Sequence, residues 1–330
     1  PWGGAGLSGF ASGRARIGEA WLIADHRHHH SIVAGGGHAG WTLHELLDHY
    51  NRRLLGSLAD GMRGGCFPLM LKIIATSDSL SVQVHPDDAT AERLGELDVG
   101  KTEMWYVLRA SPNSKLICGL QPAVTRADLS EAIESGLREA IEPMLSAFSV
   151  AEGATVLVPA GTVHAIGADL VLAEIQQNSN VTYRLYDWGR KRSLHKAQAF
   201  EAIHFGLAHP GPNRPLGYPQ RDGTCTVLAA CRYFAAEHLA VNGVCPRETG
   251  GRSFHILLLK SGMLRLADGE GTWEQPLPEG RAVLVPGEQD EYVLMGGGEC
   301  LIYYVPDLAK DIVGPLRAAG HSEEAIDALC

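Results

Sequence analysis

Two kinds of hydrophobic spacing occur along the chain. Over residues 42–58 and 125–148, apolar side chains recur every three or four positions, the spacing of an α-helix with one buried face. Elsewhere, short apolar runs such as 68–74 and 154–158 are separated by turn-forming residues, the pattern of β-strands. The chain is therefore predicted to be mainly β, with an N-terminal helix at about 42–58 and a helical insertion at about 121–148.

Local signals define the ends of some elements. Thr42 and Thr125 each precede a helical pattern and are expected to cap it. Pro143 is expected to divide the second helix into two pieces. Apolar runs at 104–108 and 115–118 flank a Ser-Pro-Asn turn, which predicts a β-hairpin.

Length and a change of composition predict two domains. A chain of 330 residues can bury two modest cores. A Pro- and Gly-rich stretch at 209–222, preceded by an expected helix at 193–205, marks a linker between residues 1–208 and 223–330. The second part again carries short strands at regular spacing, typical of a second sandwich or barrel. These strands are expected at 231–239, 255–260, 263–266, 282–285 and 301–305.

An internal repeat supports this division. Residues 153–159 and 280–286 share the skeleton of a Gly, five intervening residues and a Pro. Five positions after the Pro, the first copy has His164 and the second has Glu291. The second copy also lacks a His-x-His or Gln-x-His pair. We therefore expect two related barrels, of which only the first holds a metal ion.

Overall composition restricts the possible partners. A formal net charge of −10 argues against nucleic acid, whose phosphates need an electropositive surface, although a local basic cluster can hold one small phosphate. No apolar run reaches roughly 18 residues, so no membrane association is predicted. Nothing at the start resembles a signal peptide, and the printed chain begins with Pro1. The seven cysteines form no Cys-x-x-Cys pair, which favours reduced, buried thiols in a cytoplasmic protein.

Three segments carry side chains suited to one metal site. Alternate residues of an extended strand share a face, so Gln83 and His85 can point at one ion, and Lys101 and Glu103 share a face in the same way. His164 follows a Pro-x-Gly turn. An amide, two imidazoles and one carboxylate leave room for water or substrate. Such a set suits a catalytic divalent ion rather than a sealed structural one.

Other polar and aromatic residues have plainer interpretations. The run His28–His30 is expected to be a solvated loop, because adjacent side chains cannot easily all face one ion. Arg184 can pair with Asp187 as a scaffold contact, and His195 and His204 are expected to be surface or packing residues. Three aromatic side chains can line a sugar pocket, with core packing as the default. They are Trp105, Tyr183 and Trp188.

The motifs resemble those of a known family. Residues 153–164 are similar to the second sequence motif of cupins, which are double-sheet jelly-roll barrels with a metal at the wide mouth. A more specific resemblance is to the short bacterial form of type I mannose-6-phosphate isomerases, and it covers most of the chain before residue 200. It rests on segments 17–21, 80–87, 100–103, 158–164, 174–179 and 182–188. Ala20, where relatives more often have Ser, affects no site residue.

The resemblance implies a fold, a cofactor and a reaction. The fold is two cupin-like jelly-roll barrels, and the cofactor is one Zn²⁺ per chain in the first barrel. The reaction is the reversible interconversion of mannose 6-phosphate and fructose 6-phosphate through a cis-enediol(ate). The family pattern places the zinc ligands at Gln83, His85, Glu103 and His164, and substrate-contacting groups at Ser81, Lys101 and Arg184.

The sequence leaves several roles open. Arg184 and Lys101 can each hold the phosphate or steady a developing oxyanion. A lysine with a lowered pKa, a nearby carboxylate and a metal-bound water are all candidates for moving the proton. Two other functions stay as alternatives: another metal-dependent cupin enzyme, against which Gln83 and Lys101 argue, and a non-catalytic phosphosugar-binding cupin.

Overall fold

The computed structural model describes residue 3 and residues 17–59, 65–206 and 211–329. The chain forms two compact units, Pro1–Ala20 with Lys72–Pro212 and Trp21–Leu71 with Asn213–Cys330. The second division falls within the predicted linker at 209–222, of which residues 209 and 210 lie outside the described residues. Trp21–Leu71, which the sequence analysis placed in the first domain, groups instead with the second unit.

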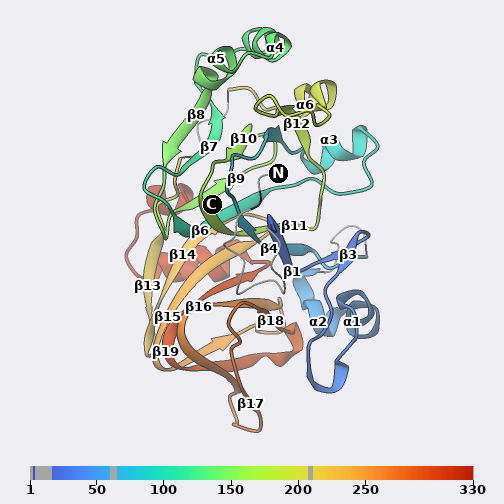
Figure 1. Ribbon diagram of the computed structural model, residues 1–330. Helices are drawn as coiled ribbons and strands as arrows, with labels where there is room; N and C mark the ends of the chain where they lie inside the picture. Colours follow the sequence, from blue (N-terminus) through green and yellow to red (C-terminus); the bar gives the residue numbers. More distant parts are fainter. Residues whose placement is uncertain (1–2, 4–16, 60–64, 207–210, 330) are drawn as a thin grey trace. The chain divides into compact units, whose positions relative to one another are not determined.

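The first unit is built on two five-stranded sheets (Figure 1). Their strand orders, β1-β4-β11-β6-β9 and β12-β5-β10-β7-β8, mix strands from distant parts of the chain. The first sheet comprises β1 (Glu19–Ile23), β4 (Leu69–Ala75), β11 (Leu170–Gln177), β6 (Glu103–Ala110) and β9 (Thr155–Val158). The second comprises β12 (Tyr183–Tyr186), β5 (Val82–Val84), β10 (His164–Ile166), β7 (Lys115–Leu120) and β8 (Leu145–Ser149).

The hairpin predicted from 104–108 and 115–118 does not form. Both strands exist, but β6 lies in the first sheet beside β11 and β9, whereas β7 lies in the second beside β10 and β8. The turn between them carries the chain from one sheet to the other, as in double-sheet jelly rolls. A local turn signal predicts that the chain reverses, but it does not specify which strand becomes the hydrogen-bonded neighbour.

The N-terminal helical region consists of two helices instead of one. Thr42 caps α1 (Leu43–Tyr50) through a reciprocal capping box with Glu45, which confirms the predicted start. Asn51, at φ 40°, then interrupts the helix before α2 (Arg52–Leu55). The uninterrupted apolar spacing over 42–58 gave no sign of this break.

The helical insertion follows the prediction at its start and departs from it at its end. Thr125 caps α4 (Arg126–Ser135), and Figure 1 shows α4 beside α5 (Arg138–Ile141) near the ends of β7 and β8. The break between the helices lies at Gly136, which adopts the left-handed conformation at φ 67°, and not at Pro143. Residues 145–148, predicted as helix, belong to β8.

The second unit contains one sheet of seven strands. Its order is β13-β14-β15-β19-β16-β17, with β18 also paired to β16. Runs predicted as separate strands at 255–260 and 263–266 form one strand, because Gly262 at φ 79° and a register shift let the backbone continue through a bend. The strands are β13 (Leu216–Gln220), β14 (Gly223–Ala230), β15 (Ala235–Glu248), β16 (His255–Asp268), β17 (Glu274–Pro276), β18 (Ala282–Val285) and β19 (Glu291–Tyr304).

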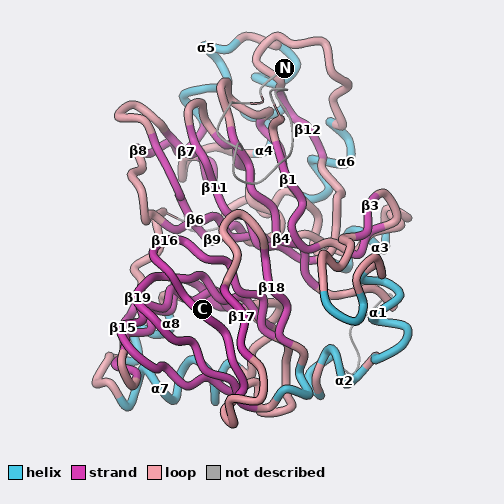
Figure 2. Tube along the Cα trace, turned by 60° about the horizontal axis from the view of Figure 1, so that its bottom comes forward, coloured by secondary structure: helices cyan, strands magenta, loops and turns pink. Residues whose placement is uncertain are grey.

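The chain is mainly β, as predicted, and Figure 2 shows strands through most of the described chain. No closed barrel occurs among the described residues, because each sheet has free ends in its strand order. The remaining elements are short. They are β2 (Asp25–His26), β3 (His29–His30), α3 (Asp88–Arg93), α6 (Lys196–Ala202), α7 (Gly314–Ala318), α8 (Glu323–Asp327) and the helical turns η1 (Gly36–His38), η2 (Ser57–Ala59), η3 (Glu142–Met144), η4 (Gly287–Gln289) and η5 (Leu308–Val313).

Each unit has its own apolar core. Residues of the two sheets and of α4 and α6 build the core clusters of the first unit, and the seven-stranded sheet packs against η5, α7 and α8 in the second. Within the described part of the chain, no helix combines the length and the apolar character needed to cross a membrane. Four cysteines are buried free thiols, as predicted: Cys118, Cys225, Cys245 and Cys300.

Candidate metal centre

Strands from both sheets of the first unit bring four predicted side chains together. Gln83 lies on β5, His85 follows that strand, and His164 begins β10. In the second sheet β10 pairs with β5, so that His164 lies directly opposite Gln83. Glu103 begins β6 in the other sheet. The sequence separation between these residues is therefore removed by the double-sheet topology.

The donor atoms of these residues face one another. His85 Nε2 lies 3.4 Å from Glu103 Oε2, and His164 Nε2 lies 3.4 Å from Glu103 Oε1. Gln83 Nε2 lies 3.2 Å from His164 Nε2, and the amide can present its oxygen at this place by turning over. Ligands held about 2.0–2.1 Å from a tetrahedral Zn²⁺ stand roughly 3.3 Å apart. The spacing of the four side chains matches that separation.

Two backbone carbonyls orient the imidazole rings. His85 Nδ1 donates to the carbonyl of Val181 at 2.8 Å, and His164 Nδ1 donates to the carbonyl of Thr162 at 2.9 Å. Because a carbonyl oxygen can only accept, each neutral ring carries its proton on Nδ1. The lone pair of each Nε2 therefore points toward Glu103, as second-shell hydrogen bonds arrange it for metal-binding histidines.

Electrostatics keep these groups in the protonation states that bind a metal. The side chains of His85, Glu103 and His164 are at most 1% exposed. Burial, followed by the charge of Lys101, lowers the pKa of His85 to about 3, and burial lowers the pKa of His164. Burial alone would raise the pKa of Glu103, but Lys101 and the two imidazoles outweigh it and hold that pKa well below its usual range. At neutral pH the site offers two neutral rings and one carboxylate.

One carboxylate oxygen tests whether a metal fits here. Glu103 Oε1 is buried and has no hydrogen-bond donor among the described residues. An unsatisfied buried acceptor is costly, whereas a bound cation would satisfy it. His85, Glu103 and His164 each offer a ligand atom within 4.8 Å of the others. The residues therefore fit a divalent ion.

Lys101 lies immediately beside the donor atoms. Its side chain is 6% exposed, and Nζ contacts Glu103 Oε2. Nζ also lies 3.2 Å from His85 Nε2 and 3.9 Å from Glu174 Oε1. Burial disfavours the ammonium form, but Glu103 and Glu174 outweigh it and raise the pKa of Lys101. The site thus includes one buried positive charge supplied by the chain.

Ser81 connects Arg184 to the donor atoms. Arg184 Nε donates to Ser81 Oγ at 3.3 Å, and Ser81 Oγ donates to Gln83 Oε1 at 3.3 Å. His195 is a packing residue, since its Nδ1 accepts the backbone N–H of Arg184 at 3.1 Å. The three residues predicted to contact substrate, Ser81, Lys101 and Arg184, therefore all adjoin the four donors.

Asp187 does not pair with Arg184, contrary to the scaffold interpretation. Its carboxylate binds two other guanidinium groups, at 2.5 Å from Arg192 Nη2 and 3.0 Å from Arg190 Nη2. Arg184 has no carboxylate partner among the described residues. Burial, followed by the charges of Arg192 and Arg190, lowers the pKa of Arg184, as expected where positive charges gather. One negative charge among three guanidinium groups leaves a net positive surface beside the site.

A tight turn positions His164. Gly161 has φ 84°, and its N–H donates to the carbonyl of His85 at 2.8 Å. A Cβ at Gly161 would lie 2.5 Å from the ring of His204. His204, expected to be a surface or packing residue, therefore packs on the turn, and its Nε2 lies 3.3 Å from Asp87 Oδ2.

The aromatic side chains near the motifs mainly pack. Trp105 is fully buried, and its ring meets that of His164 edge-on at 5.5 Å. Tyr183 is also buried and donates its hydroxyl to Glu96 at 2.9 Å. Trp188 is half-buried, with the guanidinium of Arg138 5.3 Å above its ring. Trp105 thus supports a donor residue from the core.

Two buried charges next to the site were given no role by the sequence analysis. Lys72 Nζ, on β4, lies 3.8 Å from Glu174 Oε1, on β11. Trp105 Nε1 donates to Glu174 Oε2 at 3.0 Å. Burial, followed by the charge of Lys101, lowers the pKa of Lys72, and burial raises that of Glu174. Each is the single charged residue of an apolar strand, a signal for a paired buried charge.

The histidine run at His28–His30 is only partly solvated. In the second unit His30 Nδ1 lies 2.8 Å from Asp25 Oδ1, and His44 Nδ1 lies 3.1 Å from the same oxygen. Asp25 is fully buried, so these imidazoles help to satisfy its carboxylate. His28 and His29 are exposed, as the loop interpretation expected.

Comparison with known proteins identifies the family. The model of the phosphomannose isomerase type I catalytic domain matches residues 11–107. Mannose-6-phosphate isomerase ManA of Bacillus subtilis is 34% identical over 314 residues, which are 92% of this chain and 95% of that protein. The chain belongs to the type I mannose-6-phosphate isomerase family. As in other type I isomerases, the reaction is aldose–ketose isomerisation, which sets aside the two alternative functions.

Solved structures of isomerases share the fold. The crystal structure of mannose 6-phosphate isomerase from Bacillus subtilis superimposes with a TM-score of 0.81 at 29% identity, covering 92% of this chain and 95% of that one. A mannose 6-phosphate isomerase described as holo and zinc-bound gives a TM-score of 0.68 at 15% identity, covering 88% and 91%. The predicted cupin-like fold of a type I isomerase is therefore confirmed.

Proposed function

We propose that this chain interconverts mannose 6-phosphate and fructose 6-phosphate at the centre formed by Gln83, His85, Glu103 and His164. One observation carries the assignment of the site. The only carboxylate near the two imidazoles in the described part of the first unit, Glu103, faces both of their unprotonated nitrogens from the opposite sheet. The family membership of the chain supplies the reaction, and the geometry supports the place.

Type I isomerases are metal-dependent, and Zn²⁺, one ion per chain, is the cofactor that we infer. The donor set of two imidazole nitrogens, a carboxylate and an amide oxygen suits this ion, and a structural neighbour is described as zinc-bound. One carboxylate and three neutral ligands leave a formal charge near +1. When bound, the ion supplies Lewis-acid stabilisation of the negative charge that develops on the sugar oxygens.

Lys101 is assigned to the reacting end of the sugar. Its ammonium is buried and touches the same atoms that hold the metal. A protonated lysine at this position can donate hydrogen bonds to the oxygens on carbons 1 and 2. Its charge is better used there than on a phosphate, which needs solvent-accessible space. Ser81, hydrogen-bonded to Gln83, is assigned to holding the amide and Arg184 in place.

Arg184 is assigned to the phosphate group. It is only partly buried, it has no carboxylate partner among the described residues, and Arg190 and Arg192 add positive charge beside it. A guanidinium without a carboxylate partner can form a bidentate pair with a phosphate. Phosphate bound here would lie next to the chain of hydrogen bonds that leads through Ser81 to the donor atoms.

A coupled assay for fructose 6-phosphate formation tests the proposal. Purified protein should convert mannose 6-phosphate, lose this activity after treatment with a chelator, and regain it when Zn²⁺ is added. Metal analysis of the same sample should give about one ion per chain. Full turnover by protein shown to be free of metal would refute the metal-assisted mechanism, and absence of any isomerisation by metal-loaded protein would refute the function.

A further inference from the structure

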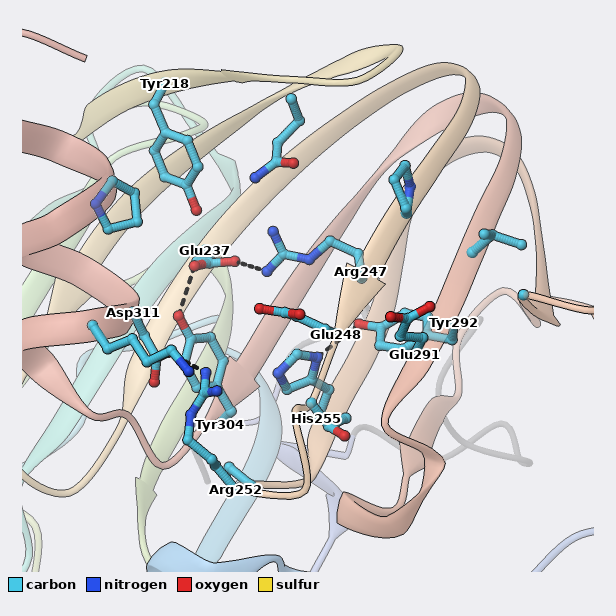
Figure 3. A pocket seen from close by; sticks show the side chains of 18 residues that line it. Tyr218, Glu237, Arg247, Glu248, Arg252, His255, Glu291, Tyr292, Tyr304 and Asp311 are labelled. Carbon is cyan, nitrogen blue, oxygen red and sulfur yellow. Dashed lines mark hydrogen bonds and ion pairs between the residues drawn. The ribbon is translucent and has the colours of Figure 1, made fainter. Parts of the chain in front are cut away.

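The second unit contains a pocket to which the isomerase reaction gives no role. Its volume is about 470 Å³, within the roughly 300–1,000 Å³ of typical small-molecule sites. Figure 3 shows polar side chains from several strands and from η5 pointing into it. The polar lining includes Glu237, Arg247, Arg252, His255, Tyr304 and Asp311.

The internal repeat places this pocket where the first unit has its metal centre. In the first unit Glu103 pairs with Val158, the residue before the Pro of the repeat. In the second unit His255 pairs with Val285, again the residue before the Pro. His255 therefore occupies the position of Glu103, and it lines the pocket.

Two further positions follow the same register. His164 and Glu291 each stand five residues after the Pro of their repeat and begin a strand. His164 lies opposite Gln83, and Glu291 lies opposite Glu248. Glu248 and Glu291 both line the pocket. The pocket is thus the counterpart of the catalytic centre.

The metal-binding character has been lost at this counterpart. Among the described residues, the two groups of three potential ligands close enough to share an ion lie elsewhere in the chain. His255 is instead buried, with Nδ1 2.8 Å from the hydroxyl of Tyr292. A polar pocket has been kept at a place where the metal ligands have not.

The base of the pocket is a preorganised set of donors and acceptors. Arg247, with 9% of its side chain exposed, donates from Nη2 to Glu237 Oε2 at 2.5 Å. Tyr304 donates its hydroxyl to the other oxygen of Glu237 at 2.7 Å. Arg247 Nε is buried and has no acceptor among the described residues. A ligand hydroxyl at this point would satisfy a donor that is otherwise left unpaired.

The charges lining the pocket favour an uncharged ligand. Arg247 is neutralised by Glu237, and Arg252 is neutralised by Asp311 at 2.6 Å. On the exposed rim, one lysine is outnumbered by two carboxylates; these are Lys310, Glu248 and Glu291. No positive charge is left over for a phosphate, unlike the surroundings of Arg184.

We propose that this pocket binds an unphosphorylated sugar, at a site separate from the catalytic centre. Sugar hydroxyls both donate and accept hydrogen bonds, so they match guanidinium donors next to carboxylate acceptors. Three tyrosine rings in the lining supply flat apolar faces for the C–H groups of a sugar ring. They are Tyr218, Tyr292 and Tyr304.

Three variants separate this site from the catalytic centre. Gly269→Trp should block the pocket, since Gly269 lines its rim, its backbone is outside the left-handed region, and the nearest atom to an added Cβ is Glu291 Oε2 at 3.9 Å. Arg247→Lys keeps the positive charge beside Glu237 but removes the Nε donor. Glu103→Gln alters the catalytic centre and leaves the pocket unchanged.

Isothermal titration of the metal-loaded protein with D-mannose, D-glucose and D-fructose, and with inorganic phosphate, tests the proposal. At least one sugar should bind saturably, about tenfold or more weakly in Gly269→Trp and severalfold more weakly in Arg247→Lys, and unchanged in Glu103→Gln. Mannose 6-phosphate turnover should stay normal in both pocket variants. The proposal is overturned if no sugar binds, if binding is lost only in Glu103→Gln, or if the pocket variants weaken phosphate binding instead. Should Gly269→Trp fail to fold, Arg247→Lys decides by the same measurement.

Discussion

At the scale of single residues, Glu103 matters most to the metal centre. Its two oxygens are the atoms that face the imidazole nitrogens, and one of them has no other partner among the described residues. Replacing Glu103 with Gln keeps the shape but removes the negative charge. We expect Glu103→Gln to lose bound metal and at least roughly a hundredfold in isomerase activity, since even indirect support of a ligand is worth ten- to a hundredfold.

Metal analysis and the coupled assay on the same preparation check this prediction. Glu131→Gln, the same change at an exposed position of α4, is the matched control and should keep both metal and activity. If Glu103→Gln binds metal and turns over like the control, the carboxylate is not a ligand.

Arg184 carries the proposed phosphate contact. Removing the charge with Arg184→Gln should raise KM for mannose 6-phosphate roughly ten- to a hundredfold, the value of one charged hydrogen bond, with a smaller effect on kcat. Inorganic phosphate, tested as a competitive inhibitor, should weaken by a similar factor. A variant that loses kcat while its KM and its inhibition by phosphate stay normal would instead assign Arg184 to the reacting carbons.

His255 makes stability depend on pH in the second unit. Burial, followed by the charges of Arg247 and Arg252, holds the pKa of His255 well below its usual 6.5. As the pH falls below about 6.5, the unfolded chain gains a proton at this residue that the folded chain cannot accept. The free energy of unfolding therefore falls, by up to about 1.4 kcal/mol per pH unit from this residue.

Denaturant unfolding at several pH values between about 6.5 and 5 checks this linkage. The variant His255→Asn cannot titrate, so its free energy of unfolding should fall less steeply with acid than that of the original chain. Equal slopes for the two proteins would show that His255 is protonated as readily in the folded chain as in the unfolded one.

At the scale of elements, the turn between β9 and β10 sets the position of His164. Gly161→Ala should destabilise the chain in two ways: its φ of 84° is unfavourable for alanine, and the added Cβ would lie 2.5 Å from the His204 ring. We expect a loss of about 2–4 kcal/mol, from roughly 1–2 kcal/mol for the backbone and a similar amount for overpacking, with weaker metal binding.

Gly153→Ala is the matched control, because Gly153 has the same φ of 84° but its nearest neighbour is a tyrosine hydroxyl at 3.9 Å. It should show only the backbone cost and keep normal metal affinity. Unfolding curves and zinc titrations of both variants give the comparison. Equal losses in the two variants would mean that the contact with His204 does not shape the site.

Local chemistry explains which elements the sequence predicted. The caps at Thr42 and Thr125 were found because a capping box involves only neighbouring residues. The breaks at Asn51 and Gly136, and the assignment of β6 and β7 to different sheets, depend on tertiary packing that no local window contains.

The candidate site was predicted better than the elements around it. Gln83, His85, Glu103 and His164 stand in strand-like motifs whose spacing survives any choice of sheet order. Lys72 and Glu174 were missed because their importance arises only when β4 and β11 lie side by side. The role of such a residue is visible once its strand partner is known.

At the scale of the whole molecule, the internal repeat predicted the relation between the two units. The repeated Gly and Pro frame β9 and β18, which occupy equivalent positions beside β6 and β16. What the sequence could not show is that Trp21–Leu71 groups with the second unit. Ser57, for example, donates its backbone N–H to Gly251 at 3.0 Å, a contact without any motif.

The central claim for the molecule is that four side chains from separate segments bind one cation in the first unit. Anomalous diffraction from crystals of the zinc-loaded protein, recorded at the zinc absorption edge, tests it most directly. We predict one strong peak about 2.0–2.2 Å from Gln83 Oε1, His85 Nε2, a Glu103 oxygen and His164 Nε2. A fully occupied zinc ion elsewhere, with these four side chains bound to no metal, would contradict the account.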